Sequence, residues 1–337
     1  MGATRADVAR LAGVSPAVVS YVLHDGTRPV APKTRERVLD AIAKLDYRPD
    51  PVAQALRGQR THSVGLLVPD HDNPFYADLQ REVEHLAFDD GLVLLVGTTG
   101  AGRDRETKYL RAFVDRRVDG LLMMSSQAPD ELSLVAAAGM PVVTLDRVQA
   151  ASGVSTVISN ERSGARRAVE HLIECGYRRI GCIAGPGESQ GATDRVAGWK
   201  EGLEAAGLVA QERLVSRGPF SREGGTSAAL ALLGDVDALF VSSDVQAAGV
   251  VALTHARGIA VPDELGIVSF DGTDLARYST PALTVVEQPM RAMAEVAMRR
   301  LNGLIADPGR TPTHDVLEPR LVVRESTRPR AAAGPEA

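Results

Sequence analysis

The chain has 337 residues, which is too long for one small domain and long enough for a small domain joined to a large α/β core. Hydrophobic residues make up 44% of it, which excludes general disorder. No apolar run approaches the roughly 20 residues that a membrane span needs. The two cysteines, Cys175 and Cys182, exclude a disulfide framework and a cysteine-rich metal cluster. Since the first residues also lack the apolar stretch of a secretory signal, we expect a cytoplasmic protein.

The charge is unevenly distributed along the chain. Residues 1–60 carry 10 Lys and Arg against 6 Asp and Glu, a net charge of +4, whereas the remainder carries 28 against 37, a net charge of −9. A basic head on an acidic body favours contact between a polyanion and the head. An asymmetry of this size also arises by chance, so charge supports such a partner without identifying it.

The first predicted element is a short helix that follows Thr4 and runs to Ala12. Thr4 and Asp7 have the spacing of a capping box, and Gly13 supplies the left-handed residue that commonly ends a helix. The apolar side of this helix carries Val8, Leu11 and Ala12.

A second helix is predicted from Pro16 to Leu23, with Ser15 as its cap and Pro16 at the first position, where the missing N–H is harmless. A polar turn leads to a third helix from about Pro32 to Leu45. The core residues expected from these two helices are Val18 or Val19, Val22, Leu23, Val38, Ala41, Ile42 and Leu45.

Two short helices around a glycine turn, braced by a third, predict a helix-turn-helix unit over residues 1–49. The second helix of such a unit fits the major groove of DNA, with its first residues at the base edges. The alternative is a three-helix cap on an enzyme, which the pattern alone does not exclude.

Residues 50–60 are predicted to be a hinge helix and linker. Asp50 caps, Pro51 starts and Gly58 ends a helix shorter than the ~12–15 residues needed for independent stability, so it forms only when something packs against it. Leu56 would be an exposed leucine beside a cation, which suits an apolar wedge in a minor groove.

From residue 61 onward, apolar strands alternate with helical segments. Near-continuous apolar runs such as SVGLLVP, GLLMMS, RIGCIAG and LGIVSFD are typical of parallel strands that helices bury on both faces. The predicted fold class is therefore α/β: an all-α helix-turn-helix head plus two doubly wound α/β lobes, with a ligand cleft beyond the carboxyl ends of the strands.

The motifs DVA-x-x-AGVS, KTRERV, YRP and NPF follow one another within residues 7–79. In this order they closely resemble the LacI/GalR family of bacterial repressors, and further matches extend to about residue 325. The resemblance implies a sequence-specific DNA-binding transcriptional repressor, a homodimer on double-stranded DNA with a palindromic operator. It also implies that a small molecule, a sugar above all, controls operator affinity from between two lobes that resemble a periplasmic binding protein.

By this resemblance, the first residues of the second helix read bases, and Leu56 of each subunit enters the minor groove at the operator centre. The DNA contacts that it implies are Thr4, Ser15, Pro16, Ala17, Ser20, Tyr21, Thr34, Arg35, Ala53, Leu56 and Arg57. Tyr21 stands where the family more often has Arg, Val18 where Thr is common, and Asp50 where Asn is common. These departures leave the base sequence of the operator half-site open.

The resemblance also implies the limits of the domains. Residues 61–326 form the effector-binding domain, with a first lobe of about 61–160 and 289–320 and a second of about 161–288 and 321–326. The tail, 327–337, is expected to be disordered.

Polar and aromatic residues at the strand ends are the effector contacts that the family pattern implies: Asp70, Asn73, Phe75, Ser125, Arg147, Arg195, Phe220, Asp244, Asp271 and Gln288. Carboxylates, an Arg fork and an amide bind hydroxyls, while Phe75, Phe220 or Phe270 cover the apolar face of a sugar. A purine held by stacking is the other candidate. For any one of these residues, a turn or helix cap after a strand is an alternative role.

An enzyme and a free-standing sugar-binding protein are the alternative classes. The loop from Gly185 to Gly191 follows a strand but lacks the GK[ST] and GxGxxG patterns of phosphate loops, so we expect a cleft loop. HExxH does not occur, no serine is expected in a nucleophile elbow, and Trp199 is expected in the core. We therefore expect no catalytic residue, cofactor or metal. A free sugar-binding protein would leave residues 1–60 without a role.

Overall fold

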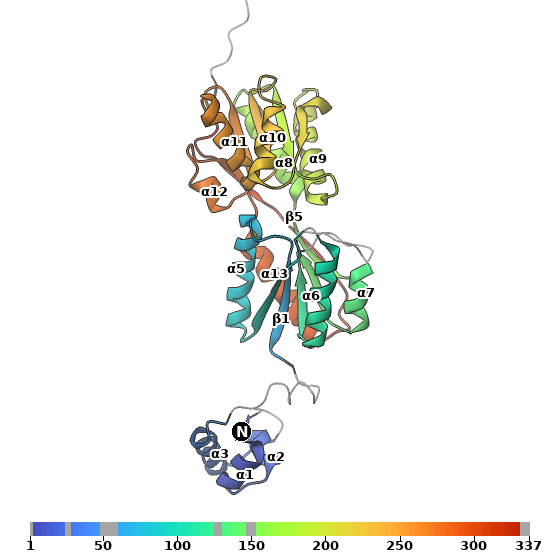
Figure 1. Cartoon of the computed structure of the whole chain (residues 1–337), viewed down its shortest axis with the longest axis vertical. Coiled ribbons are helices and arrows are strands. Elements are labelled where there is room, and N and C mark those ends of the chain that lie inside the picture. Colours follow the sequence, from blue (N-terminus) through green and yellow to red (C-terminus); the bar gives the residue numbers. More distant parts are fainter. Residues whose placement is uncertain are drawn as a thin grey trace, which may run out of the picture. The chain divides into compact units, whose positions relative to one another are not determined.

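The computed structural model of the chain describes residues 3–23, 28–47, 60–100, 102–124, 130–145 and 153–330. The chain divides into two compact units, one up to Thr61 and one from His62 onward (Figure 1). The predicted hinge helix, with Ala53, Leu56 and Arg57, lies outside the described residues.

The described part of the first unit contains the helices α1 (Arg5–Ala12), α2 (Pro16–Leu23) and α3 (Pro32–Lys44), close to the predicted positions. The predicted capping box is present, because Asp7 N–H donates to Thr4 Oγ1 and Thr4 N–H donates to Asp7 Oδ2. Gly13 ends α1 in the left-handed conformation, at φ 64°. The core of the unit is the buried cluster of Val8, Ala9, Ala12, Val19, Val22, Val38, Ala41 and Tyr47.

Leu11 does not join this core. It is 52% exposed, so the prediction that it packs inside is wrong. The buried side of α1 runs through Val8, Ala9 and Ala12. Since each residue turns the helix by about 100°, Leu11 lies beyond the edge of that side.

The first lobe of the second unit is a parallel sheet with the strand order β11-β5-β4-β3-β1-β2. Its strands are β1 (Ser63–Val68), β2 (Val93–Thr98), β3 (Gly120–Met123), β4 (Val142–Leu145), β5 (Ser155–Ser159) and β11 (His314–Leu317). Helices α5 (Pro74–Asp89) and α13 (Met290–Ala306) cover one face, and α6 (Arg103–Asp115) and α7 (Asp130–Ala137) cover the other (Figure 1). Burial on both faces explains why these strands are almost continuously apolar.

The second lobe repeats this plan with the strand order β12-β10-β9-β8-β6-β7, in which β12 is antiparallel to β10. Its strands are β6 (Ile180–Ala184), β7 (Val215–Arg217), β8 (Ala238–Val241), β9 (Gly266–Asp271), β10 (Thr284–Glu287) and β12 (Arg320–Val322). Helix α8 (Glu161–Glu174) packs on α9 (Gln190–Ala205), and α10 (Arg222–Leu230) packs on α11 (Asp244–Arg257). The short elements η1 (Glu212–Leu214) and α12 (Asp274–Arg277) complete the lobe.

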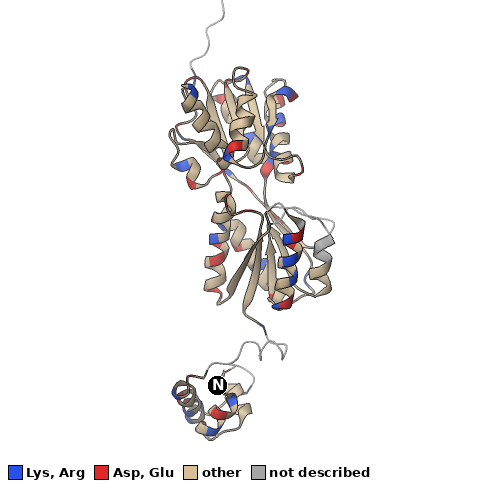
Figure 2. Cartoon of the chain, in the orientation of Figure 1, with Lys and Arg blue, Asp and Glu red and all other residues tan. Residues whose placement is uncertain are grey.

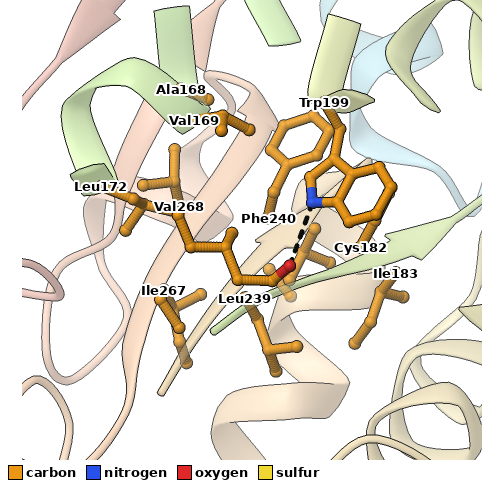
Figure 3. Packing of buried hydrophobic residues seen from close by; sticks show 14 of the residues in the cluster. Ala168, Val169, Leu172, Cys182, Ile183, Trp199, Leu239, Phe240, Ile267 and Val268 are labelled. Carbon is orange, nitrogen blue, oxygen red and sulfur yellow. Dashed lines mark hydrogen bonds between the residues drawn. The ribbon is translucent and has the colours of Figure 1, made fainter. Parts of the chain in front are cut away.

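Trp199 lies in the core of the second lobe, as predicted, and is 2% exposed. Its indole N–H donates to the carbonyl of Ile180 at 3.2 Å, so burial leaves no polar atom of the ring without a partner. Figure 3 shows the ring among apolar side chains of the sheet and of α8, including Phe240 and Val169.

The chain passes between the lobes after β5, after β10 and after β11. At the last of these passages, Leu317 pairs with Ser159 in the first sheet and Arg320 pairs with Glu287 in the second. Arg320 therefore belongs to the second lobe, whereas the sequence-based limits leave it in the first.

The prediction that the tail is disordered from Thr327 is wrong for its first residues. Thr327 is 5% exposed, and its Oγ1 lies 2.7 Å from Thr284 Oγ1 and 2.9 Å from His171 Nε2. Arg330 N–H donates to the carbonyl of Cys175 at 2.8 Å. These partners come from distant parts of the second lobe, so the polar sequence of the tail does not reveal them. The rest of the tail lies outside the described residues.

Both cysteines are buried and free. The described residues contain no group of three or more His, Cys, Asp or Glu arranged to hold a metal ion. No single helix in the described part of the chain is long and apolar enough to cross a membrane; α1 and α2 meet that test only when joined across a bend of 102°.

The contact between α8 and α9 requires glycine at position 198. A Cβ at Gly198 would collide with the carbonyl oxygen of Arg162 and lie 2.8 Å from Ala165 Cβ. Gly198→Ala is therefore expected to lower the free energy of unfolding by about 2 kcal/mol, measured by urea unfolding followed through Trp199 fluorescence. Gly187→Ala is the control, because no atom lies within 4 Å of its added Cβ. Equal losses in the two variants would show that close packing at Gly198 is not the cause.

Candidate functional site

Helix α2 carries the predicted base-reading face of the head. The predicted base-reading residues Pro16, Ala17 and Tyr21 are exposed or half-buried, and so are Ser15 and Ser20, which the resemblance assigns to phosphate contacts. The guanidinium carbon of Arg28 lies 5.9 Å from the centre of the Tyr21 ring. Figure 2 shows no charged residue on α2, whereas α1 and α3 carry both signs. This face therefore offers hydroxyls, a phenol and apolar surface, all of which can contact base edges.

The two other predicted phosphate contacts, Thr34 and Arg35, and the predicted DNA contact Thr4 lie at helix starts. Thr34 and Arg35 are half-buried in the first turn of α3, where the helix dipole favours an anion. Thr4 is exposed at the start of α1, but its hydroxyl already donates to Asp7 at 2.6 Å. All three contacts stay predictions.

A cavity of about 530 Å³ lies at the carboxyl ends of strands from both lobes. The predicted effector contacts that line it are Asp70, Asn73, Phe75, Arg195, Phe220 and Asp271. The loop after β6 also lines it, as expected of a cleft loop, through Pro186, Glu188, Ser189, Gln190 and Gly191. Carboxylates, an amide and hydroxyls thus face the same space as aromatic rings.

Three predicted residues do not line this cavity. Asp244 is 1% exposed, and Gln288 is 2% exposed. Phe270 is fully buried and cannot cover a ligand; its ring instead lies 4.0 Å from the guanidinium carbon of Arg195. Ser125 and Arg147 lie outside the described residues, so their contacts stay predictions.

Arg195 joins several strand ends of the second lobe below the cavity. Its Nε donates to Glu161, the first residue of α8, and its Nη1 donates to the carbonyl of Ser242 after β8. The same Nη1 lies 3.6 Å from Asp271 Oδ1 at the end of β9. Only 7% of the Arg195 side chain and 9% of the Glu161 side chain are exposed. The network therefore holds the guanidinium in one orientation.

Asp271 adopts a backbone conformation that is rare for a residue with a side chain, at φ 118°. Asp244 fixes the turn that follows: its carboxylate accepts hydrogen bonds from the N–H groups of Gly272 and Thr273 at 2.9 and 2.7 Å, and from two side-chain hydroxyls. Gln288 Nε2 donates to Asp271 Oδ1 at 2.9 Å. Asp244 and Gln288 thus position Asp271 from behind.

Burial is the main cause of the raised pKa values of Asp244, Asp271 and Glu161. It raises the pKa of Asp244 from 3.8 to about 6, against four hydrogen bonds that lower it. Burial also raises the pKa of Asp271 well above its ordinary value, with Arg195 opposing the change and the Asp244 charge adding to it. The pKa of Glu161 is likewise raised by burial and lowered by Arg195.

The cavity also contains residues that the sequence analysis missed. Tyr76 stacks edge-on against Phe75, with ring centres 5.2 Å apart. Ser221 and Ser243 line the cavity as the caps of α10 and α11, and Ser189, in the predicted cleft loop, has the unpredicted role of capping α9. A serine just before an apolar helical segment is a recognisable cap signal, so these positions could have been found.

Gly187-Glu188-Ser189-Gln190-Gly191 matches the spacing of a nucleophile elbow, but its conformation is that of a helix cap. Ser189 has φ −79° and ψ 119°, and its Oγ accepts the N–H of Ala192 at 3.3 Å. The strained backbone that exposes a catalytic serine is not present at this serine, and no histidine is among the described residues that line the cavity.

Comparison with family models gives matches to both parts of the chain. Residues 4–50 match the model for bacterial regulatory proteins of the lacI family, and residues 169–327 match the model for a periplasmic binding protein-like domain. The HTH-type transcriptional regulator DegA of Bacillus subtilis (strain 168) is 33% identical over 98% of this chain and 99% of its own length.

Solved structures give the same result. A complex of the transcriptional regulator CelR with cellobiose is 34% identical, with a TM-score of 0.74 over 96% of this chain and 99% of the other. The lac repressor dimer bound to operator and the anti-inducer ONPF is 27% identical, with a TM-score of 0.86 over 97% of this chain and 100% of the other.

Proposed function

The chain belongs to the LacI family of bacterial regulatory proteins, and we propose that it represses transcription from operator DNA under the control of a sugar bound between its lobes. The observation that carries this proposal is the cavity at the strand ends. It combines hydroxyl-binding side chains such as Asp70, Asn73 and Asp271 with the rings of Phe75 and Phe220. Alternating polar and apolar faces are what a sugar presents to a protein.

A relative supports the choice of ligand class. The CelR structure holds cellobiose, which is a sugar, in a protein 34% identical to this chain. A purine would bind the same rings by stacking. A thermal-shift screen that contains both sugars and nucleobases distinguishes the two ligand classes.

We also propose that the repressor is a cytoplasmic homodimer without enzymatic activity. The lac repressor structure is a dimer on its operator. In this chain, α5 and the edge strand β2 expose Phe88 by 75%, Val93 by 61% and Val96 by 38%, an apolar surface suited to a second copy. A twofold axis would place the two heads on the halves of a palindrome.

The coupling between the sites would run through the lobes. Effector binding changes the angle between them, which moves the paired hinge segments and decides whether each marginal hinge helix folds on DNA. A coupling free energy of about 1–3 kcal/mol would change operator affinity by roughly 5- to 150-fold.

The test is a thermal-shift screen of the full chain against sugars, sugar phosphates and nucleobases, followed by operator gel shifts with each stabilising compound. A ligand that binds only the folded state raises the unfolding midpoint by mass action. A sugar that both stabilises the protein and changes operator affinity supports the proposal. A nucleobase that does so, or normal operator binding that no compound alters, contradicts the sugar assignment.

The head offers a matched pair of substitutions. Tyr21→Ala is expected to weaken binding by about 1–3 kcal/mol and to relax preference at one operator position, because it removes a base contact. Arg35→Ala is expected to weaken binding to all sequences alike and to reduce the slope of log affinity against log salt by about 1, because it removes a phosphate contact. Binding measured at several salt concentrations on matched and mutated operators separates the two. Equal loss on all sequences for Tyr21→Ala would contradict its assigned role.

A further inference from the structure

We infer that the cavity selects an uncharged, hydroxyl-rich ligand and excludes its phosphorylated or carboxylated counterpart. The inference rests on the proposed function and narrows the ligand class of the same cavity. Three observations support it: the charges around the cavity, the partners that Arg195 already has, and the caps on the helices that begin beside the cavity.

The charged groups at the cavity are mostly acidic. Asp70, Glu188 and Asp271 line it, and Arg195 is the one cation among the lining residues that the structure describes. Glu161 adds a further carboxylate directly behind Arg195. Acidic groups in a partly enclosed space repel an anion and leave a neutral ligand unaffected.

Arg195 already has acidic partners, with which an anionic ligand would compete. Its Nε is paired with Glu161, its Nη1 is bonded to the Ser242 carbonyl, and Asp271 lies 3.6 Å from the same nitrogen. An anionic ligand that drew the guanidinium away would leave the Glu161 carboxylate, 9% exposed, without its countercharge. Leaving a buried carboxylate without a countercharge is unfavourable.

Helix starts are the other usual anion sites, and at three helix starts beside the cavity a cap already accepts one of the amides. Asn73 Oδ1 accepts the N–H of Phe75 at 3.1 Å at the start of α5. Ser189 and Ser221 accept the N–H groups of Ala192 and Gly224 at 3.3 and 3.0 Å at the starts of α9 and α10. A phosphate there would lie beside the cap oxygens and the acidic lining, whereas a sugar hydroxyl can donate to carboxylates in place.

The predicted contact Arg147, outside the described residues, does not reverse this balance. Arg195 already shares Glu161 and Asp271, so a second cation at Arg147 would be set against Asp70 and Glu188. Two carboxylates against one further cation still leave the described lining acidic.

The experiment compares each sugar with its phosphate on the full chain. Glucose and glucose 6-phosphate, ribose and ribose 5-phosphate, and cellobiose and its 6′-phosphate are titrated at constant ionic strength. Binding is followed by the emission of Trp199, the single tryptophan, which lies one helical turn after Arg195 on α9. Inorganic phosphate is titrated in the same way and gives a result whichever sugar the protein recognises.

The expected result is that the neutral member of any responding pair binds at least about tenfold more tightly than its phosphate, and that inorganic phosphate causes no saturable change. A phosphorylated member that binds more tightly, or saturable quenching by inorganic phosphate, would overturn the inference. The double variant Asp70→Asn, Glu188→Gln is the second measurement. It should reduce the difference in affinity between a sugar and its phosphate. An unchanged difference would exclude these carboxylates as its cause.

This outcome is separable from failure of the proposed function. Operator binding that responds to a sugar phosphate would refute only the charge selection. Failure to bind any DNA sequence, measured by selection from a random pool, would refute the repressor assignment and leave the phosphate titration valid.

Discussion

Arg195→Met is expected to lower the free energy of unfolding by about 3–5 kcal/mol, the range found when one partner of a buried ion pair is removed. The variant leaves the Glu161 and Asp271 side chains, 9% and 3% exposed, without the cation that both share. Since burial already raises the pKa of both carboxyls, protonation relieves part of the loss in acid. The loss should therefore be smaller at pH 5 than at pH 7 in urea unfolding followed through Trp199.

Arg213→Met is the matched control. Arg213 pairs with Asp235 at 3.1 Å, but 59% and 62% of the two side chains are exposed, so its removal should change stability by less than about 1 kcal/mol. Operator binding at 4 °C should persist in both variants, because the head is a separate unit. If Arg195→Met were no more destabilising than Arg213→Met, the buried network would not stabilise the second lobe.

Asp244→Asn is expected to remove a pH dependence of up to about 3 kcal/mol from the free energy of unfolding. The folded pKa of Asp244 is raised from 3.8 to about 6, so the folded protein holds this proton more tightly than the unfolded chain does. The resulting stability is fully present below pH 4 and is lost as the pH rises through about 6. The variant should therefore gain stability relative to the wild type between pH 4 and pH 7.

The amide suits this position sterically. Its oxygen can accept from Gly272 and Thr273, and its NH₂ can donate to the Ser269 hydroxyl that now donates to Asp244. Asp315→Asn is the control with the opposite sign: Arg300 lowers the pKa of Asp315, so that variant should lose stability relative to the wild type as the pH rises through the ordinary range of a carboxyl. Parallel pH curves for the wild type and Asp244→Asn would contradict the assignment.

The sequence predicts the head almost to the residue because its signals are local. The Thr4 and Asp7 box, Gly13 and Pro16 each act within one turn of a helix, and the structure has them where they are predicted. The prediction for Leu11 is wrong because three apolar residues on a two-turn helix do not specify which side of it the neighbouring helices cover.

The cleft is predictable in outline and not in detail. Asp244 and Asp271 both follow apolar strands, but only Asp271 lines the cavity. The Asp244 carboxylate instead accepts the N–H groups of Gly272 and Thr273, which are too distant in sequence for a local signal to specify. Glu161 escapes prediction because its partner Arg195 is 34 residues away. The short strand β12 and the packed start of the tail are not predicted either, because their partners are also distant in sequence.

The last residues of the chain complete both lobes. The first sheet needs β11 beside β5, and the second needs β12 and Ser326, whose Oγ donates to the Ile267 carbonyl at 2.6 Å and accepts the N–H of Thr284 at 2.8 Å. During synthesis the head can fold as soon as it leaves the ribosome, because its core closes within residues 3–47. Neither lobe can be finished until nearly the whole chain has been translated. A ribosome that stalls before residue 314 would therefore hold a folded DNA-binding head attached to two unfinished lobes.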